Sequence, residues 1–209
     1  VIDRRDVSYP LPERLLASIA DRHMGVGCDQ VVLIEPPANG ADIRFRFHNA
    51  DGSEAGACGN GTRCAAAMVM RDQERRDLSI ETITAVLQAD MEASGRVIVD
   101  MGPARTDWHE IPLLRDVDTL QLPLKMDELP HPVGVGMGNP HCVFIVEDAE
   151  AIDIERIGPA VEHNALFPDR TNVEFLTRLA DGRWRMRVWE RGVGITLACG
   201  SGVCAAVVA

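Results

Sequence analysis

The stretch HNADGSEAGACGNGTRCAAAMVM, residues 48–70, places a cysteine in a glycine-rich turn directly before an apolar segment. From Asn60 onward the pattern is helical, and residues 64–70 are apolar without interruption. Such a run predicts a helix with no solvent-exposed side, buried inside a lobe of the protein. Cys58 would then lie at the first turn of this helix.

The same pattern occurs again at residues 198–209, ACGSGVCAAVVA. Asn49 lies nine residues before Cys58, and Glu190 lies nine residues before Cys199. Chance recurrence of a short glycine motif is the alternative explanation. The spacing favours two homologous halves, residues 1–104 and residues 105–209, with a proline-punctuated link at residues 103–132.

Hydrophobic periodicity predicts the same order of elements in both halves. The first half is expected to contain a helix and five strands, at residues 12–22, 30–35, 42–48, 78–84, 86–92 and 96–101. In the second half we expect a helix at residues 153–163 and a hairpin of residues 171–180 and 183–190 around Asp181-Gly182. The fold class is therefore α+β with two pseudo-symmetric lobes.

Composition excludes several classes of partner. The 209-residue chain has a net charge of −11 and no Lys/Arg-rich run that could follow a phosphate backbone, which argues against nucleic acid. No apolar run reaches the roughly 20 residues of a membrane span. The six cysteines form no C-x-x-C pair, so free thiols and no bound metal are expected. These features predict a cytoplasmic protein, with homodimer formation left open.

Two equivalent halves are expected to face each other, which would set the two Cys-Gly-x-Gly turns on opposite sides of one cleft. The positive end of a helix lowers the pKa of a nearby thiol below its free value of about 8.5. Glycines allow close approach of a ligand, and N–H groups at the helix end can bind a carboxylate. One thiolate could remove the proton next to that carboxylate while the opposite thiol delivers another, which inverts the stereocentre.

A pyridoxal cofactor is not expected, because the only lysine, Lys125, lies in LPLKMDELP, far from any glycine-rich turn. The sequence also lacks a metal-spaced His/Cys cluster. A mechanism with no cofactor is favoured, in which helix-end electrostatics and desolvation stabilise the carbanion.

Four motifs in order, HNADGSEAGACGNGTRC, MGNPHCVFIVED, RTNVEF and WERGVGITLACGSGVCAA, resemble the diaminopimelate epimerase family over nearly the whole chain. This resemblance implies cofactor-independent interconversion of LL- and meso-diaminopimelate in lysine and peptidoglycan precursor synthesis. It also implies that each lobe is a curled mixed or antiparallel sheet around a central helix, with the substrate in the cleft between the lobes.

The resemblance assigns the two acid/base roles to Cys58 and Cys199. The α-carboxylate would be bound by four residues that follow the thiols: Gly59, Asn60, Gly200 and Ser201. His141 and Glu190 would lie beside the reacting carbon and position the amino group or tune the thiols. The distal end of the diamino diacid would be held by four residues, Asn49, Asn139, Asn172 and Arg191, with Gln30 lining the site.

Other interpretations stay open. The chain could be another cofactor-independent racemase of the same fold, such as a proline or histidine racemase, or a thiol-redox or metal-binding protein that uses Cys58 and Cys199. His141 could be a structural histidine, Glu190 an exposed strand end and Arg191 a surface charge. We expect the remaining cysteines to be small core residues: Cys28, Cys64, Cys142 and Cys204. We expect the strand at residues 183–190 to have a solvated face that carries Arg183, Arg185 and Arg187.

The repeat also predicts that the natural protein extends at both ends of this chain. The GNPH sequence at residues 138–141 lies about sixty residues before Cys199, and the equivalent position in the first half falls upstream of Val1. Three strands are expected after the first apolar helix, whereas the second apolar helix is the last element. An apolar helix without a covering sheet would expose more apolar surface than a monomeric domain tolerates.

Overall fold

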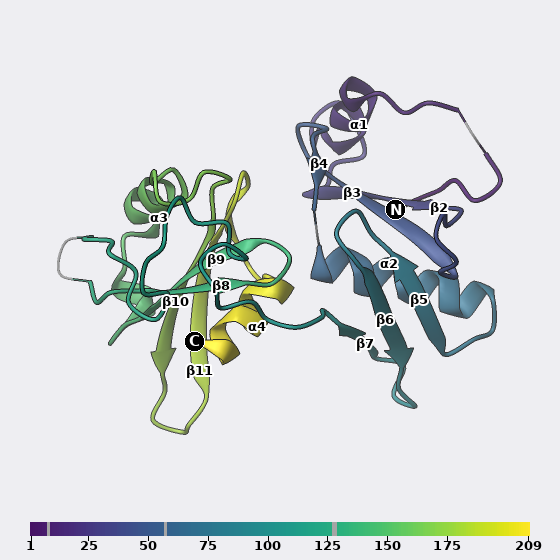
Figure 1. The fold of residues 1–209 in the computed structure, drawn as a ribbon. Helices are drawn as coiled ribbons and strands as arrows, with labels where there is room; N and C mark the ends of the chain where they lie inside the picture. Colours follow the sequence, from purple (N-terminus) through teal and green to yellow (C-terminus); the bar gives the residue numbers. More distant parts are fainter. Residues whose placement is uncertain (8, 57, 127–128) are drawn as a thin grey trace. The chain divides into compact units, whose positions relative to one another are not determined.

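The computed structural model describes residues 1–7, 9–56, 58–126 and 129–209. Contacts within the chain divide it into two compact units, Val1–Gly102 and Pro103–Ala209, shown in Figure 1. No helix in these described ranges is long and apolar enough to cross a membrane.

Unit 1 is a mixed sheet with one helix against its concave side. Its elements in chain order are β1 (Ile2–Asp3), α1 (Glu13–Ala20), β2 (Gln30–Glu35), β3 (Ile43–Asn49), β4 (Glu54–Ala55), α2 (Gly59–Asp72), β5 (Asp77–Glu81), β6 (Val86–Met91) and β7 (Val97–Asp100). The strand order is β1-β2-β3-β5-β6-β7, with β4 paired to β3. The β1–β2 and β3–β5 pairs are parallel and the others antiparallel.

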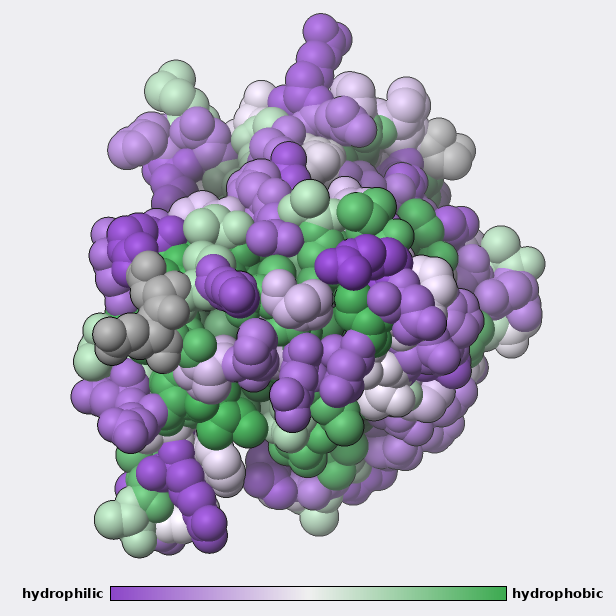
Figure 2. Space-filling view, turned by 60° about the vertical axis from the view of Figure 1, so that its left-hand side comes forward, coloured by the Kyte–Doolittle hydropathy of each residue, from purple (hydrophilic) through white to green (hydrophobic). Residues whose placement is uncertain are grey.

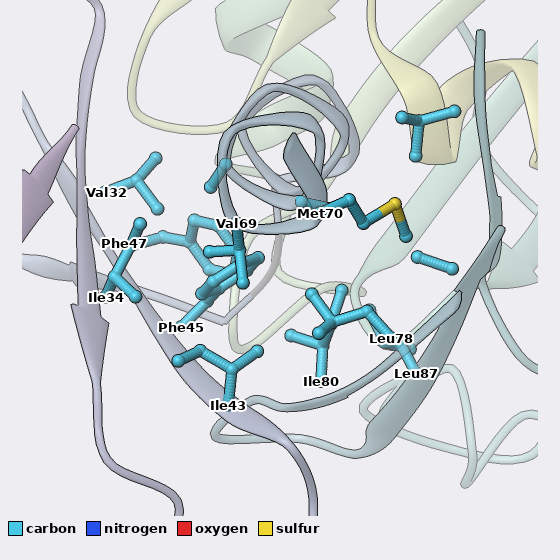
Figure 3. Packing of buried hydrophobic residues seen from close by; sticks show 14 residues of the cluster. Val32, Ile34, Ile43, Phe45, Phe47, Val69, Met70, Leu78, Ile80 and Leu87 are labelled. Carbon is cyan, nitrogen blue, oxygen red and sulfur yellow. The ribbon is translucent and has the colours of Figure 1, made fainter. Parts of the chain in front are cut away.

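The core of unit 1 lies between α2 and the curled sheet. The side chains of Ile43, Phe45 and Phe47 alternate toward the helix from β3, as the period of a strand requires. Val69 and Met70 of α2 point into the same cluster, which Figure 3 shows from close by. The helix is thus fixed by apolar contacts with strands on several sides.

The prediction that residues 64–70 have no exposed side is wrong. Cys64 is exposed and Met68 is 49% exposed, whereas Ala65, Val69 and Met70 are buried. Positions 64 and 68 are about one helical turn apart and share a face. The run therefore has one exposed face and one buried face, although all of its residues are apolar. Exposed positions of α2 include Cys64 and Met68 within the run, and Arg63 and Arg71 on either side of it.

Unit 2 is a five-stranded sheet with helices on both faces. Its elements are β8 (Val133–Gly136), β9 (Pro140–Ile145), a 3₁₀ turn η1 (Ala149–Ala151), α3 (Ile154–Glu162), β10 (Asn172–Arg178), β11 (Trp184–Glu190), β12 (Gly194–Thr196) and α4 (Gly200–Val208). The strand order is β12-β11-β10-β9-β8, and only β9–β10 is parallel. The predicted hairpin is confirmed as β10 and β11, with Gly182 at φ +84° in its turn.

The internal repeat is visible in the topology. In unit 1 the order β1-α1-β2-β3-β4-α2 runs through a parallel pair, an antiparallel hairpin, a short antiparallel strand and a helix that begins after Cys58. The order β9-α3-β10-β11-β12-α4 does the same and ends in a helix that begins after Cys199. This shared order excludes chance recurrence of the glycine motif.

Residues 103–132 were predicted to be a link, but the described part of this segment packs into unit 2. Its side chains Ile111, Leu113, Leu122 and Leu124 are buried in one cluster with Phe144 and Phe175 and with α3. Proline and turn residues marked irregular backbone correctly, but these four apolar side chains supply core.

The other face of the unit 2 sheet carries α4 and a shallow apolar groove. The groove has a volume of about 420 Å³ and is lined by Ile145, Leu176, Trp184, Met186, Val203, Ala206, Val207 and Ala209. Val207 is 83% exposed there. Figure 2 shows apolar surface between polar residues on one side of the molecule. Three strands follow α2 in unit 1, whereas α4 is the last described element of unit 2.

Candidate active site

Each of the two apolar helices begins with a cysteine as its N-cap. Cys58 has extended backbone angles, and its sulfur accepts a hydrogen bond from the N–H of Gly61 at 3.2 Å. Cys199 repeats this geometry before α4, with a bond from the N–H of Gly202 at 3.3 Å. The first N–H groups of a helix lack partners within the helix, and the helix end is positive. Both sulfurs therefore lie where an anion is stabilised.

A polar cluster surrounds Cys199 within unit 2. Nδ1 of the His141 ring lies 2.7 Å from Glu174 Oε1, and its Nε2 lies 2.9 Å from Asn139 Oδ1. Asn139 Nδ2 in turn donates to Ser201 Oγ at 3.5 Å, and this hydroxyl is 3.5 Å from the sulfur of Cys199. The structure thus brings together three predicted site residues, His141, Asn139 and Ser201, next to the thiol.

Glu190 is the second acidic group at this thiol. It ends β11, and its carboxylate accepts a hydrogen bond from the Thr196 hydroxyl of β12. Burial raises the pKa of Glu190, a shift that the hydrogen bond from Thr196 opposes and the neighbouring charge of Glu174 increases. The carboxyl group is therefore half-buried and available for proton exchange, and it is not an exposed strand end.

The pKa expected for Cys199 from the helix end alone is wrong for this structure. Burial, followed by the negative charge of Glu190, raises the pKa of Cys199 to about 12. The hydrogen bonds from Ser201 and from the N–H of Gly202 lower it by less. Desolvation and a like charge therefore outweigh the helix end, and Cys199 is a protonated thiol at neutral pH.

Glu190→Gln is expected to lower the pKa of Cys199, because it removes a negative charge that opposes the thiolate. Burial is the larger cause and is unchanged, so the pKa should stay above the ordinary value. The pH dependence of alkylation by iodoacetamide, followed on the peptide that carries Cys199, should move to lower pH. Cys204 provides an internal control, since burial alone raises its pKa. An unmoved alkylation curve at Cys199 would contradict the assignment.

Asn172 and Arg191 form a rigid corner beside Glu190. Asn172 is buried, accepts from the backbone N–H of Arg191 at 2.9 Å and donates to the carbonyl of Pro140 at 3.0 Å. The Arg191 guanidinium donates to the carbonyl of Asp169 at 2.9 Å. In this structure both side chains hold backbone, and their contact with a substrate stays a prediction.

Unit 1 brings a matching set to the region before α2. Gln30 and Asn49 are opposite each other on β2 and β3, and Gln30 Nε2 donates to Asn49 Oδ1 at 3.2 Å. Asn49 also donates to Ser53 Oγ at 3.1 Å. Gly59 and Asn60 occupy the first turn of α2, directly after Cys58. In the repeat, Gln30 corresponds to Asn172 and Asn49 corresponds to Glu190. The Asn49 amide of unit 1 is therefore replaced by the Glu190 carboxylate in unit 2.

Comparison with known proteins identifies the family. The model of the family described as diaminopimelate epimerase matches residues 1–106 and 133–209. The chain belongs to the diaminopimelate epimerase family. Its relatives include diaminopimelate epimerases from Rhodospirillum centenum, 53% identical, and Acidiphilium cryptum, 49% identical. All of this chain is covered in both comparisons, together with 72% and 75% of those proteins.

Solved structures show the same fold as this diaminopimelate epimerase family chain. A hydroxyproline epimerase from Agrobacterium vitis matches with a TM-score of 0.65 at 14% identity, over 93% of this chain and 63% of that one. A probable proline racemase from Agrobacterium radiobacter K84 matches with a TM-score of 0.65 at 13% identity, over 92% and 65%. The predicted α+β fold with two lobes is thereby confirmed.

Two buried acids next to the predicted site residues of this family member were missed by sequence reasoning. Glu174 contacts His141, and Glu162 accepts bonds from Trp189 Nε1 at 2.7 Å and from the N–H of Gly192 at 2.9 Å. Glu162 thereby fixes the turn that follows Glu190. A glutamate inside the apolar strand RTNVEFL was a usable signal, because buried charges are rare unless paired. Glu162, near a helix end, gave none.

The expectations for other cysteines and arginines are partly met. Cys142 is buried, as expected for a core residue, whereas Cys64 is exposed and Cys28 and Cys204 are intermediate. Arg183 and Arg185 are exposed, as a solvated strand face requires. Arg187, on the same face, is half-buried and donates to the carbonyls of Ala149, Glu150 and Ile152 at the 3₁₀ turn.

Proposed function

We propose that this protein interconverts LL- and meso-diaminopimelate without a cofactor, with Cys58 and Cys199 as the two acid/base groups. Membership of the diaminopimelate epimerase family supports the substrate. The observation that carries the proposal is the repeated N-cap cysteine, because both halves of the chain preserve a thiol at the start of an apolar helix. A placement in lysine and peptidoglycan precursor synthesis follows from the same substrate.

Proton exchange at the α-carbon needs an acid and a base on opposite faces. Cys199, with its pKa raised to about 12, is protonated at neutral pH and equipped to deliver a proton. Cys58 then removes the proton from the other face, and the roles reverse for the opposite epimer. The N–H groups of Gly59 and Asn60, and of Gly200 and Ser201, bind the α-carboxylate and stabilise the charge that develops beside it.

The polar residues around the thiols serve recognition. Glu190 is half-buried and can pair with the α-ammonium group, which would also screen its charge from Cys199. Asn49 and Asn139, with Asn172, Arg191 and Gln30, hold the distal carboxylate and ammonium group of the diamino diacid. His141 is completely buried and tunes the thiol side of the site rather than contacting solvent. A cytoplasmic location and a homodimer stay predictions from the sequence.

Epimerisation in deuterated water tests the two-base mechanism. We expect deuterium at the α-carbon of the product from the first turnovers, while recovered substrate stays unlabelled, because each thiol carries its own solvent-derived hydron. Mass spectrometry of both epimers at low conversion measures the two labels. Equal early labelling of substrate and product would indicate a single base.

The substrate assignment needs a separate control. Proline, hydroxyproline and histidine should not be racemised under conditions in which LL-diaminopimelate is, and activity should persist in the presence of a chelator and a reductant. Turnover of proline at a comparable rate would favour a different racemase of this fold. Loss of activity with chelator would favour a metal-dependent protein.

A further inference from the structure

Glu174 is a buried carboxylate at the centre of unit 2. It lies on β10 with no exposed surface, and its Oε2 has no hydrogen-bond partner among the residues that the structure describes. Burying a charged group with an unpaired oxygen costs several kcal/mol unless a strong interaction offsets it. An apolar residue would pack here at lower cost, so the carboxylate needs a functional explanation.

Among the residues that the structure describes, the hydrogen-bond partner of Glu174 is His141. Both side chains are fully buried, and Oε1 lies 2.7 Å from the ring Nδ1. Neighbouring strands set this pair: His141 is opposite Asn172 in the parallel β9–β10 ladder, and Glu174 follows two residues later on the same face. The carboxylate therefore reaches the ring from below α4.

The first turn of α4 is shaped around this carboxylate. A Cβ atom at Gly202 would lie 2.7 Å from Glu174 Oε1 and 3.2 Å from the Cβ of Cys199. Real Cβ atoms do not approach an oxygen so closely, so glycine at this position leaves room for Glu174 directly beneath the thiol. The same residue donates its N–H to Cys199 Sγ. Glu174, His141 and Cys199 thus form one packed unit.

We propose that Glu174 is a positioning residue that holds a proton on Nδ1 of His141 and turns its Nε2 toward the Cys199 side of the site. A carboxylate that orients a functional histidine acts in this way in other enzymes, where it selects the tautomer and the ring orientation. Nε2 then faces Asn139, which reaches Ser201 and through it the thiol. As a role in catalysis, this inference rests on the proposed function.

Nitrogen-15 NMR of the full chain, labelled at histidine, tests the tautomer directly. In the wild-type protein Nδ1 of His141 should be protonated. Glu174→Met removes the acceptor at similar volume and should leave Nδ1 unprotonated, because the ring then keeps its proton on Nε2, where it faces Asn139 Oδ1. The kcat should fall roughly 10- to 100-fold with little change in KM, as for other carboxylates that orient a histidine.

Two further variants make the test decisive. Leu176→Met alters the same face of β10 two residues away and should keep both the His141 signals and kcat. Glu174→Gln replaces the methionine variant if that variant does not fold. Its kcat should be near the wild-type value if Nδ1 of His141 is protonated, and reduced if Nδ1 is unprotonated. A variant with Nδ1 unprotonated and normal kcat, or a wild type with Nδ1 unprotonated, overturns the proposal. Absence of epimerase activity in the wild type would defeat the proposed function while the NMR result still decides the tautomer.

Discussion

Cys199→Ala and Cys58→Ala are each expected to lower kcat for epimerisation by about 10²- to 10⁴-fold, the range for loss of a general acid or base. Each substitution removes the only group that the proposed mechanism gives to one face of the α-carbon. The substrate can still bind, because its carboxylate contacts are backbone N–H groups, so KM should change much less. A coupled assay on LL-diaminopimelate measures both quantities.

The chain contains a matched control for each thiol. Cys204 lies on α4 with Cys199, and Cys64 lies on α2 with Cys58. Cys204→Ala and Cys64→Ala change the same residue type on the same helix, away from its first turn, and should leave kcat within about twofold of wild type, as expected of positions outside a catalytic site. A Cys199→Ala variant with near-normal turnover would remove this thiol from the mechanism.

Gly202→Ala is expected to have the second largest effect. Its new methyl group would lie 2.7 Å from Glu174 Oε1 and 3.3 Å from Cys199 Sγ. The carboxylate is held by His141 and has no free space, so the first turn of α4 must shift instead. Overpacking of this kind lowers the free energy of unfolding by about 1–3 kcal/mol. A displacement of the thiol by about 1 Å can lower kcat about 100-fold.

Urea unfolding and steady-state kinetics of the same preparation measure the two effects of Gly202→Ala. Gly56→Ala is the control, since the added methyl would meet only Thr84 Cγ2, at 3.5 Å, in a segment close to the other thiol. If Gly202→Ala retained wild-type stability and turnover, the close packing of Glu174 beneath α4 would be wrong.

Sequence periodicity predicted the hairpins and helices well, because each of these depends on local pattern. Residues 42–48 and the Asp181-Gly182 hairpin are examples, as strand alternation and turn chemistry act over a few neighbours. The apolar run after Cys58 misled, because α2 exposes Cys64 and Met68, which are apolar residues and so do not mark the exposed side in the sequence. Residues 103–132 misled for the opposite reason: irregular backbone that is rich in proline still supplies buried leucines.

The sequence named residues that the structure clusters around Cys199, but it could not give their energetics. The repeated spacing placed Glu190 and Cys199 together, and the structure has them in one cluster. Whether the helix end or desolvation dominates the pKa of Cys199 depends on how deeply the thiol is buried and on how close the Glu190 carboxylate lies. Sequence spacing determines neither. Glu174 shows the same limit, because its significance lies in contact with His141 across two strands.

The cysteine N-caps imply a compromise between stability and activity. A thiol is a weak hydrogen-bond acceptor, whereas serine, threonine, aspartate and asparagine are the preferred caps. The chain nevertheless uses sulfur at Cys58 and Cys199, the N-caps of α2 and α4. Selection for thermal stability alone would replace both with oxygen caps. Substitutions chosen to stabilise the protein should therefore leave both N-cap cysteines unchanged, because the proposed chemistry depends on their sulfur atoms.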